Sequence, residues 1–369
     1  MPHVLIAPDK FKGSLTAREA ARSLAEGMAG RTDGSAIRCL PVADGGEGTL
    51  DAAVSAGFEL VRVTVSGPTG LAVRSGLAVR DRTAVVEMAS ASGLGLLPGG
   101  VPDPMGATST GTGQLVLAAL DRRCDTIVLG VGGSACTDGG SGMLTALGAK
   151  MLDRRRVPIG PGGEGLRFLD SVDLGGLDPR LATARFVLAS DVDSPLLGPY
   201  GAAAVYAPQK GATPAEVQLL EAGLRRWAEL VDPAAAVLPG AGAAGGVGFA
   251  AIAVLGAERR PGAGVVLDLV DFAGQLAGAT LVVTGEGSLD RQTLRGKAPA
   301  AVAEAARADG IPVVAACGRC ELAPDELLRA GFARAYSLVE VASGPTQSMD
   351  RAGELLSELG RWIATDWFR

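Results

Sequence analysis

Five segments of the sequence combine glycine with charged or hydroxyl-bearing residues directly after an apolar run: residues 9–14, 44–49, 130–142, 191–201 and 285–297. Glycine lets backbone N–H groups approach phosphate or carboxylate oxygens closely, whereas Asp and Glu bind Mg²⁺ or accept a proton and Lys neutralises negative charge. Each segment alone is an ordinary strand-to-helix connection. Together they favour a pocket for a small anionic substrate and indicate phosphoryl transfer.

The Gly296-Lys297 pair is the part of the sequence that comes nearest to a Walker A motif. Ala298 follows the lysine where the motif requires Ser or Thr, and Arg291 stands where it requires the upstream glycine. Any nucleotide site in this chain is therefore of another type.

Two glycine patterns match a dinucleotide-binding fingerprint in form: Gly130, Gly132 and Ala135 after an apolar run, and residues 240–245. Asp153 lies eighteen residues beyond Ala135, near the place of a ribose-binding acid. However, further glycine and charged residues interrupt the helix that should follow the first pattern. The first pattern still leaves a nicotinamide-dependent oxidoreductase as an alternative function. A non-catalytic small-molecule binding protein is the second alternative.

The single histidine, His3, stands at the N-terminal edge of the first apolar run. Ligands collect at the opposite, carboxyl ends of parallel strands, so we expect His3 to be a strand residue and not a general base. Proton abstraction therefore falls to a carboxylate or a lysine.

The sequence contains five cysteines, an odd number in a long chain, which indicates a reducing compartment and no disulfide framework. Cys317 and Cys320 form a CxxC pair, but no second pair accompanies it and apolar residues 313–316 precede it. We therefore predict buried or incidental thiols here, and neither a redox nor a zinc site.

The net charge of -6 gives the chain no basic surface for DNA or RNA. The apolar run at residues 4–7 is too short for a signal peptide, and residues 233–257 contain too much glycine for a lipid-facing helix. We expect a cytoplasmic protein with neither a nucleic-acid nor a membrane partner. The sequence leaves its oligomeric state open, a homo-oligomer included.

Apolar runs bounded by turn residues predict buried strands at residues 4–7, 37–42, 126–129, 186–189, 202–206, 281–284, 311–315 and 333–337. Residues 60–87 alternate Val, Thr and Arg around turns at residues 67–70 and 80–82, which predicts antiparallel hairpins. A further helix is expected after Gly113.

Two Thr-x-x-Glu capping boxes predict helix starts at Thr16 and Thr213. The second helix has Pro214 at its first position, where proline is favoured. Its helically spaced apolar residues predict a core-facing stripe of Leu219, Leu220, Leu224 and Trp227.

The chain is long enough for two domains, and its strand–helix alternation is similar at the two ends. We predict that residues 1–62 and 268–369 share one parallel sheet, and that residues 63–267 form an inserted second α/β domain of mixed sheet. The active site is expected in the cleft between the two domains, at the carboxyl ends of strands.

Taken together, the polar loops resemble those of the bacterial class I glycerate kinases. Six ordered motifs across essentially the whole chain carry the resemblance: APDKFKGSL (7–15), PVADGGEGT (41–49), GGSACTDGG (132–140), DVDSPL (191–196), PQKGA (208–212) and TGEGSLDRQT (284–293), the last followed by Gly296-Lys297. The sequence departs from the usual family residues at Lys10, Thr137, Ser194 and Ala207. Of these, Ser194 is the one expected to alter a substrate or metal contact.

The resemblance implies a flavodoxin-like domain made from both chain ends, with an inserted α/β domain. It also implies an enzyme that phosphorylates D-glycerate with ATP and Mg²⁺, with 2-phosphoglycerate favoured over 3-phosphoglycerate as the product.

By their chemistry, Asp191, Lys12 and Asp44 are predicted to be catalytic, with Asp191 orienting or deprotonating the attacking hydroxyl. The predicted substrate-binding residues are Ser14, Glu47, Ser134, Asp138 and Lys210. The predicted nucleotide-binding residues are Gly285, Glu286, Gly287, Asp290 and Lys297. Asp191 and Glu286 are the predicted Mg²⁺ ligands.

Overall fold

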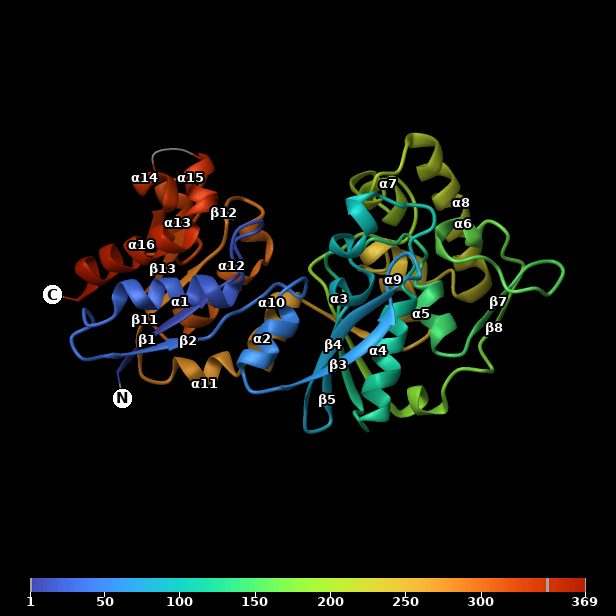
Figure 1. The fold of residues 1–369 in the computed structure, drawn as a ribbon, viewed down its shortest axis with the longest axis horizontal. Helices are drawn as coiled ribbons and strands as arrows, with labels where there is room; N and C mark the ends of the chain where they lie inside the picture. The colour runs from blue at the N-terminus through green and yellow to red at the C-terminus, as the bar shows by residue number, and fades with distance from the viewer. Residues whose placement is uncertain (1, 343–344, 369) are drawn as a thin grey trace. The chain divides into compact units, whose positions relative to one another are not determined.

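The computed structural model describes residues 2–342 and 345–368 of the chain, which divides into two compact units. The first unit consists of Met1–Asp44, Asp51–Gly57 and Pro261–Arg369, and the second of Gly45–Leu50 and Phe58–Arg260 (Figure 1). Both chain ends therefore lie in one unit, and the middle of the chain makes the other.

The first unit is built on a five-stranded sheet in which every neighbouring pair is parallel. Its strands, in spatial order, are β15 (Arg334–Ser337), β13 (Val313–Cys317), β11 (Ala279–Gly285), β1 (His3–Pro8) and β2 (Ala36–Cys39). Counted along the unit, the order is 2-1-3-4-5, which is that of flavodoxin-like folds. This confirms the predicted parallel sheet shared by the two chain ends.

Helices cover both faces of this sheet, because successive side chains of a strand point to opposite faces. Val4 and Ile6 of β1 pack with helices α1 (Ala17–Met28) and α16 (Ala352–Trp367), whereas Leu5 and Ala7 pack with α10 (Gly262–Leu269), α11 (Phe272–Leu276) and α12 (Ala298–Ala308). Further short helices of this unit are α13 (Pro324–Arg329), α14 (Leu338–Val341) and α15 (Pro345–Asp350), together with α2 (Thr49–Ser55) from Asp51 onward. The sheet is thus buried on both faces, as parallel sheets normally are.

Two sequence features fix the position of α1. The predicted capping box is confirmed, since Thr16 Oγ1 accepts from the Glu19 N–H at 3.2 Å and the Thr16 N–H donates to Glu19 Oε2 at 2.9 Å. Gly27 faces α16 so closely that a Cβ there would lie 1.9 Å from the Ser357 carbonyl oxygen. Only glycine permits this approach of the two helices.

The second unit is built on a six-stranded mixed sheet, which confirms the predicted class of the insertion. Its strands, in spatial order, are β10 (Glu258–Arg260), β9 (Arg185–Ala189), β6 (Thr126–Gly130), β5 (Thr83–Glu87), β4 (Ala72–Arg80) and β3 (Glu59–Ser66). The pairs β3–β4 and β4–β5 are antiparallel, as the hairpin pattern predicted, and the remaining pairs are parallel.

The longest helix of the second unit, α8 (Pro214–Val231), begins at the predicted capping box of Thr213 and Glu216. Its residues Leu220, Leu224 and Trp227 are buried as predicted, while Leu219 is half-buried. The Trp227 Nε1–H donates to the Gly139 carbonyl oxygen at 3.0 Å. This helix therefore packs against the glycine-rich loop that follows β6.

The prediction of a strand at residues 202–206 is wrong, because these residues form the short helix α7 (Ala202–Tyr206). Three consecutive alanines favour a helix, and the segment lacks the alternation of a half-buried strand. The strand predicted at residues 37–42 is shorter than expected, since β2 ends at Cys39.

The helix expected after Gly113 begins earlier, as α4 (Thr110–Asp121). A Cβ at Gly111 would lie 2.0 Å from the Ser66 carbonyl oxygen, and one at Gly113 would lie 2.3 Å from the Met143 carbonyl oxygen. These glycines serve close packing within the helix, whereas the sequence pattern placed them before it.

No helix in the described part of the chain is both long enough and apolar enough to cross a membrane. The glycine-rich segment at residues 233–257 contains α9 (Ala243–Ala253), whose first turn holds Ala244, Gly245 and Gly246 at positive φ.

Candidate active site

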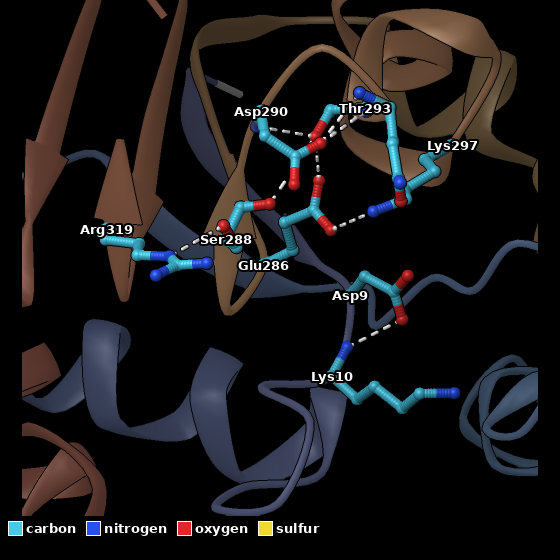
Figure 2. A network of polar contacts seen from close by, with 9 residues as sticks. Asp9, Lys10, Glu286, Ser288, Asp290, Thr293, Lys297 and Arg319 are labelled. Carbon is cyan, nitrogen blue, oxygen red and sulfur yellow. Dashed lines mark hydrogen bonds and ion pairs between the residues drawn. The ribbon is translucent and has the colours of Figure 1, made fainter. Parts of the chain in front are cut away.

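In the first unit, polar loops follow the neighbouring parallel strands β1 and β11 at their carboxyl ends. The two strands are in register up to Pro8 and Gly285, and the Asp9 N–H donates to the Gly285 carbonyl oxygen at 2.8 Å. Asp9 and Glu286 are consequently the first acidic side chains beyond the sheet edge (Figure 2). Ligands of open α/β sheets bind at this edge.

Glu286 is buried and engages both of its carboxylate oxygens. Oε1 accepts from Thr293 Oγ1 at 2.5 Å, and Oε2 accepts from Lys297 Nζ at 3.3 Å (Figure 2). Burial raises the pKa of the Glu286 carboxyl above its ordinary value, against the opposing effects of Thr293 and Lys297. The structure thus brings together two of the predicted nucleotide-binding residues, Glu286 and Lys297.

The other predicted nucleotide-binding residues shape the same loop. Asp290 Oδ1 accepts from the Gln292 N–H at 2.7 Å and so closes a turn. A Cβ at Gly285 would lie 1.7 Å from the Ala316 carbonyl oxygen of β13, so this glycine is required by the neighbouring strand. Gly287 accepts a hydrogen bond from the Arg319 N–H at 3.1 Å through its carbonyl oxygen. Whether these groups contact a nucleotide stays a prediction.

Asp9 opens the first of the five polar segments, but the sequence analysis did not single it out as a candidate site residue. Its side chain is 5% exposed, and Oδ1 accepts from the Lys10 N–H at 2.6 Å. Burial, together with the negative charges of Asp44 and Glu286, raises the pKa of the Asp9 carboxyl to about 8. A carboxyl group with a pKa near neutrality, next to other polar loops, is a candidate acid or base. Its place directly after the apolar run of residues 4–8 was the available signal.

Three other predicted residues of the first unit differ in exposure. Lys12 and Ser14 are exposed, and Ser14 Oγ donates to the Phe11 carbonyl oxygen at 3.1 Å. Asp44 is half-buried and contributes to the negative charge around Asp9. Because neither side chain is fully buried, a ligand can reach both predicted catalytic residues, Lys12 and Asp44.

In the second unit, the glycine-rich loop of residues 45–50 is held by Glu87, which the sequence analysis did not single out. Glu87 is buried at the end of β5, and its Oε2 accepts from the Gly48 N–H at 3.0 Å and the Leu50 N–H at 2.9 Å. Glu47, a predicted substrate-binding residue, is exposed on the same loop. Glu87 therefore fixes the backbone of this loop, while the Glu47 side chain is open to solvent.

Asp138 lies in the loop after β6, where it is fully buried and holds backbone together. Its Oδ2 accepts from the Ser109 N–H and Oγ, each at 2.8 Å, and its Oδ1 accepts from the Gly140 N–H at 3.0 Å. The Asp138 carboxylate, which the sequence analysis predicted to bind substrate, thus accepts hydrogen bonds from groups of the protein itself. These contacts support a positioning role for Asp138.

Lys210 is also buried, with 2% of its surface exposed. Its Nζ donates to Ser134 Oγ at 3.0 Å and to the Cys136 carbonyl oxygen. Burial lowers the pKa of the Lys210 ammonium. Ser134 and Lys210, both predicted to bind substrate, are thus brought into contact, with the lysine beneath the loop.

Replacing Lys210 by Met tests this positioning role. The variant leaves Ser134 Oγ and the Cys136 carbonyl oxygen without their buried donor, so we expect a loss of about 1–3 kcal/mol in the free energy of unfolding. Urea denaturation measures it, and Lys150→Met, at an exposed lysine of β7 (Lys150–Leu152), is the matched control. An unchanged midpoint in Lys210→Met would show that the buried ammonium does not stabilise the loop.

The loop after β9 carries Asp191, which is half-buried. Two contacts fix its neighbours: Asp193 Oδ1 accepts from an Arg259 N–H at 2.6 Å, and Ser194 Oγ lies 3.0 Å from the Tyr206 hydroxyl. Arg259, on β10, was missed because its partner is 66 positions away in the sequence. The catalytic role of Asp191 stays a prediction.

The dinucleotide fingerprint at Gly130, Gly132 and Ala135 does not open a helix. The next helix, α5 (Ser141–Ala146), begins only after Gly140 and has 6 residues. A Cβ at Gly132 would lie 2.5 Å from the Gly46 Cα, so packing against the loop of residues 45–50 accounts for this glycine. The pattern lacks the helix N-terminus that a pyrophosphate requires.

The predicted Mg²⁺ ligands, Asp191 and Glu286, belong to different units. Within residues 2–342 and 345–368, no three His, Cys, Asp or Glu side chains form a ready-made metal site. Mg²⁺ nevertheless needs only one or two carboxylates when substrate phosphates supply further oxygens. The neighbouring carboxyl groups of Asp9, Asp44 and Glu286 supply the oxygen ligands that such a cation needs.

Similarity to known proteins extends over nearly the whole chain. Residues 4–368 match the glycerate kinase family. The chain is 41% identical to a glycerate kinase of Bacillus subtilis over 368 residues, which cover 98% of this chain and 96% of that protein. It is 42% identical to the glycerate 2-kinase of Escherichia coli over 322 residues, which cover 85% of this chain and 84% of that protein.

A solved structure shares the fold as well as the sequence. The crystal structure of a protein described as a glycerate kinase 2 from Salmonella typhimurium superimposes with a TM-score of 0.84 at 39% identity. The match covers 99% of this chain and 98% of that chain.

Proposed function

Because the chain belongs to the glycerate kinase family, we propose that it is an ATP-dependent kinase that phosphorylates D-glycerate, with 2-phosphoglycerate as the product. The observation that carries the proposal is the family match across residues 4–368, which includes all five polar loops. The name of the Escherichia coli relative, glycerate 2-kinase, supports the choice of the 2-hydroxyl.

The loop after β11 is the proposed binding site for the ATP phosphates. Lys297 is the N-cap residue of α12, an 11-residue helix, so a cation and the positive end of a helix dipole coincide there. Glu286 holds the Lys297 ammonium at 3.3 Å and keeps it at this loop. Lys12 is the proposed second cation for phosphate or carboxylate oxygens.

Asp191 is the proposed base for the attacking hydroxyl. The glycerate hydroxyl oxygen forms the new bond to the γ-phosphorus, its proton passes to the Asp191 carboxylate, and the bond to the bridging oxygen of ADP breaks. In the proposed reaction, Ser134 and Glu47 bind the substrate.

Mg²⁺, held by Glu286 with Asp9 and Asp44, would neutralise charge that develops on the phosphoryl oxygens. The chain's own contribution is to hold these carboxylates in fixed positions through hydrogen bonds. Glu286 is fixed by Thr293 and Lys297, and Asp9 by the Lys10 N–H.

Ligand-induced thermal shifts separate this proposal from the two alternative functions. We expect ATP with Mg²⁺ to raise the melting temperature because it binds the native state, and NADH to leave it unchanged. ADP release must also depend on added D-glycerate. A shift with NADH would support an oxidoreductase, and binding of glycerate without ADP release would support a non-catalytic binding protein.

A further inference from the structure

The CxxC pair lies at the carboxyl end of the first unit's sheet, next to the proposed nucleotide loop. Cys317 is the last residue of β13 and is buried, whereas Cys320 belongs to the short strand β14 (Arg319–Cys320) and is half-buried. Gly318 alone separates the two strands. Cys317 Sγ lies 3.6 Å from the Tyr336 carbonyl oxygen, and Cys320 Sγ lies 3.8 Å from the Leu322 carbonyl oxygen.

The environments of the two thiols differ in the way that a redox-active pair requires. The neighbouring Cys317 thiol lowers the pKa of the Cys320 thiol to about 6, while Cys320, together with burial, raises the pKa of Cys317. At neutral pH the accessible Cys320 is therefore a thiolate that can react first, and the buried Cys317 is a thiol that can react second. This arrangement was not expected from a lone CxxC pair.

The backbone of the CxxC segment is paired directly with the nucleotide loop. β14 runs parallel to β12 (Ser288–Leu289), with Cys320 in register with Leu289. The Gly318 N–H donates to the Glu286 carbonyl oxygen and the Arg319 N–H to that of Gly287, each at 3.1 Å.

A side chain strengthens this pairing. Arg319 Nε donates to Ser288 Oγ at 3.1 Å (Figure 2). A Cβ at Gly318 would lie 2.3 Å from the Gly287 carbonyl oxygen, so the two segments are in close contact. Any movement of residues 317–320 therefore changes the contacts that hold residues 286–289.

We propose that Cys317 and Cys320 are a redox modification site that forms a reversible disulfide by exchange with a low-molecular-weight disulfide, and that the bond loosens the loop of residues 286–290. The sulfurs must approach to about 2.05 Å, which draws β14 away from its present pairing with β12. The effect on ATP rests on the proposed function. Disulfide formation itself does not.

The exchange is balanced in two steps. The Cys320 thiolate attacks one sulfur of the small disulfide, which forms a mixed disulfide and releases one thiolate. The released thiolate takes the Cys317 proton, and the Cys317 sulfur then attacks Cys320 Sγ and expels the second thiolate. The protein dithiol is oxidised by two electrons, and the small disulfide is reduced to one thiol and one thiolate, which takes its proton from solvent.

Treatment of the full-length protein with oxidised glutathione tests the site. Mass spectrometry should show the loss of two hydrogens and a Cys317–Cys320 linked peptide, and dithiothreitol should reverse both. Hydrogen exchange of residues 286–290 should accelerate by about fivefold or more in the oxidised form, because their backbone hydrogen bonds weaken. The Kd for ATP should rise by a similar factor.

Two variants control the experiment. Cys320→Ser should resist the change in exchange rate and in ATP affinity, whereas Cys39→Ser, at an exposed cysteine of β2, should respond like the native protein. A glutathione adduct that persists on Cys320, or a Cys317–Cys320 disulfide with unchanged exchange at residues 286–290, would overturn the proposal. Failure of the reduced protein to bind ATP would instead count against the proposed function, while hydrogen exchange still decides the redox site.

Discussion

Replacing Asp191 by Asn is expected to lower kcat by a factor on the order of 10² or more while the fold stays intact, because the amide cannot accept the proton of the attacking hydroxyl. Asn has nearly the same size and keeps one oxygen, so the loop after β9 should retain its conformation. The KM for ATP should change little, since other residues, those of the loop after β11, are proposed to bind the ATP phosphates. A coupled assay of ADP release measures both constants.

Asp193→Asn is the matched control for this experiment. Asp193 lies in the same loop, but its side chain is 80% exposed and pairs with Arg259. It should keep kcat within a fewfold of the native value, because the pair is a partly exposed ion pair of small energy. If Asp191→Asn turns over as fast as Asp193→Asn, the base is another residue, and Asp9 becomes the first candidate.

Asp9→Asn is expected to make the protein more stable and less active. The Asp9 carboxyl has a pKa of about 8 in the folded protein, against an ordinary value of 3.8. Between these values the folded state binds more protons than the unfolded state, so the free energy of unfolding falls as the pH rises from about 4 to about 8. Asn removes this dependence. At pH 7 without metal, the gain should be on the order of a few kcal/mol.

The activity of Asp9→Asn should fall by about tenfold or more, because the site loses one of the carboxylates that a cation or a proton would use. Urea unfolding at pH 5 and pH 8 should give a stability difference from the native protein that grows with pH. Asp33→Asn, at an exposed aspartate of the same unit, should show neither effect. A destabilised Asp9→Asn variant would contradict the account of the buried carboxyl.

Much of the fold followed from local patterns that the structure retains. The capping boxes at Thr16 and Thr213 depend on residues three positions apart, and they appear as predicted. The parallel sheet from both chain ends followed from similar strand–helix alternation. The strand predicted at residues 202–206 failed because a short run of small apolar residues has no period that separates a helix from a strand.

The candidate site was harder to predict, because burial and long-range pairing decide what a polar residue does. Glu286 and Lys297 are 11 positions apart and could be grouped from the sequence. Lys210 and Ser134 are 76 positions apart, and nothing local shows that the lysine lies under the loop. Asp9 and Glu87 are buried at the ends of strands, and the sequence indicates this burial only through their positions next to apolar runs.

Proton-coupled phosphorus NMR of the product formed from D-glycerate, ATP and Mg²⁺ tests the central claim most directly. A phosphate ester on the 2-hydroxyl couples to one hydrogen and gives a doublet, whereas an ester on the 3-hydroxyl couples to two and gives a triplet. We predict a doublet that grows together with the ADP signals and only when D-glycerate is present. A triplet would contradict the proposed product, and ATP left unconsumed with D-glycerate present would contradict the kinase itself.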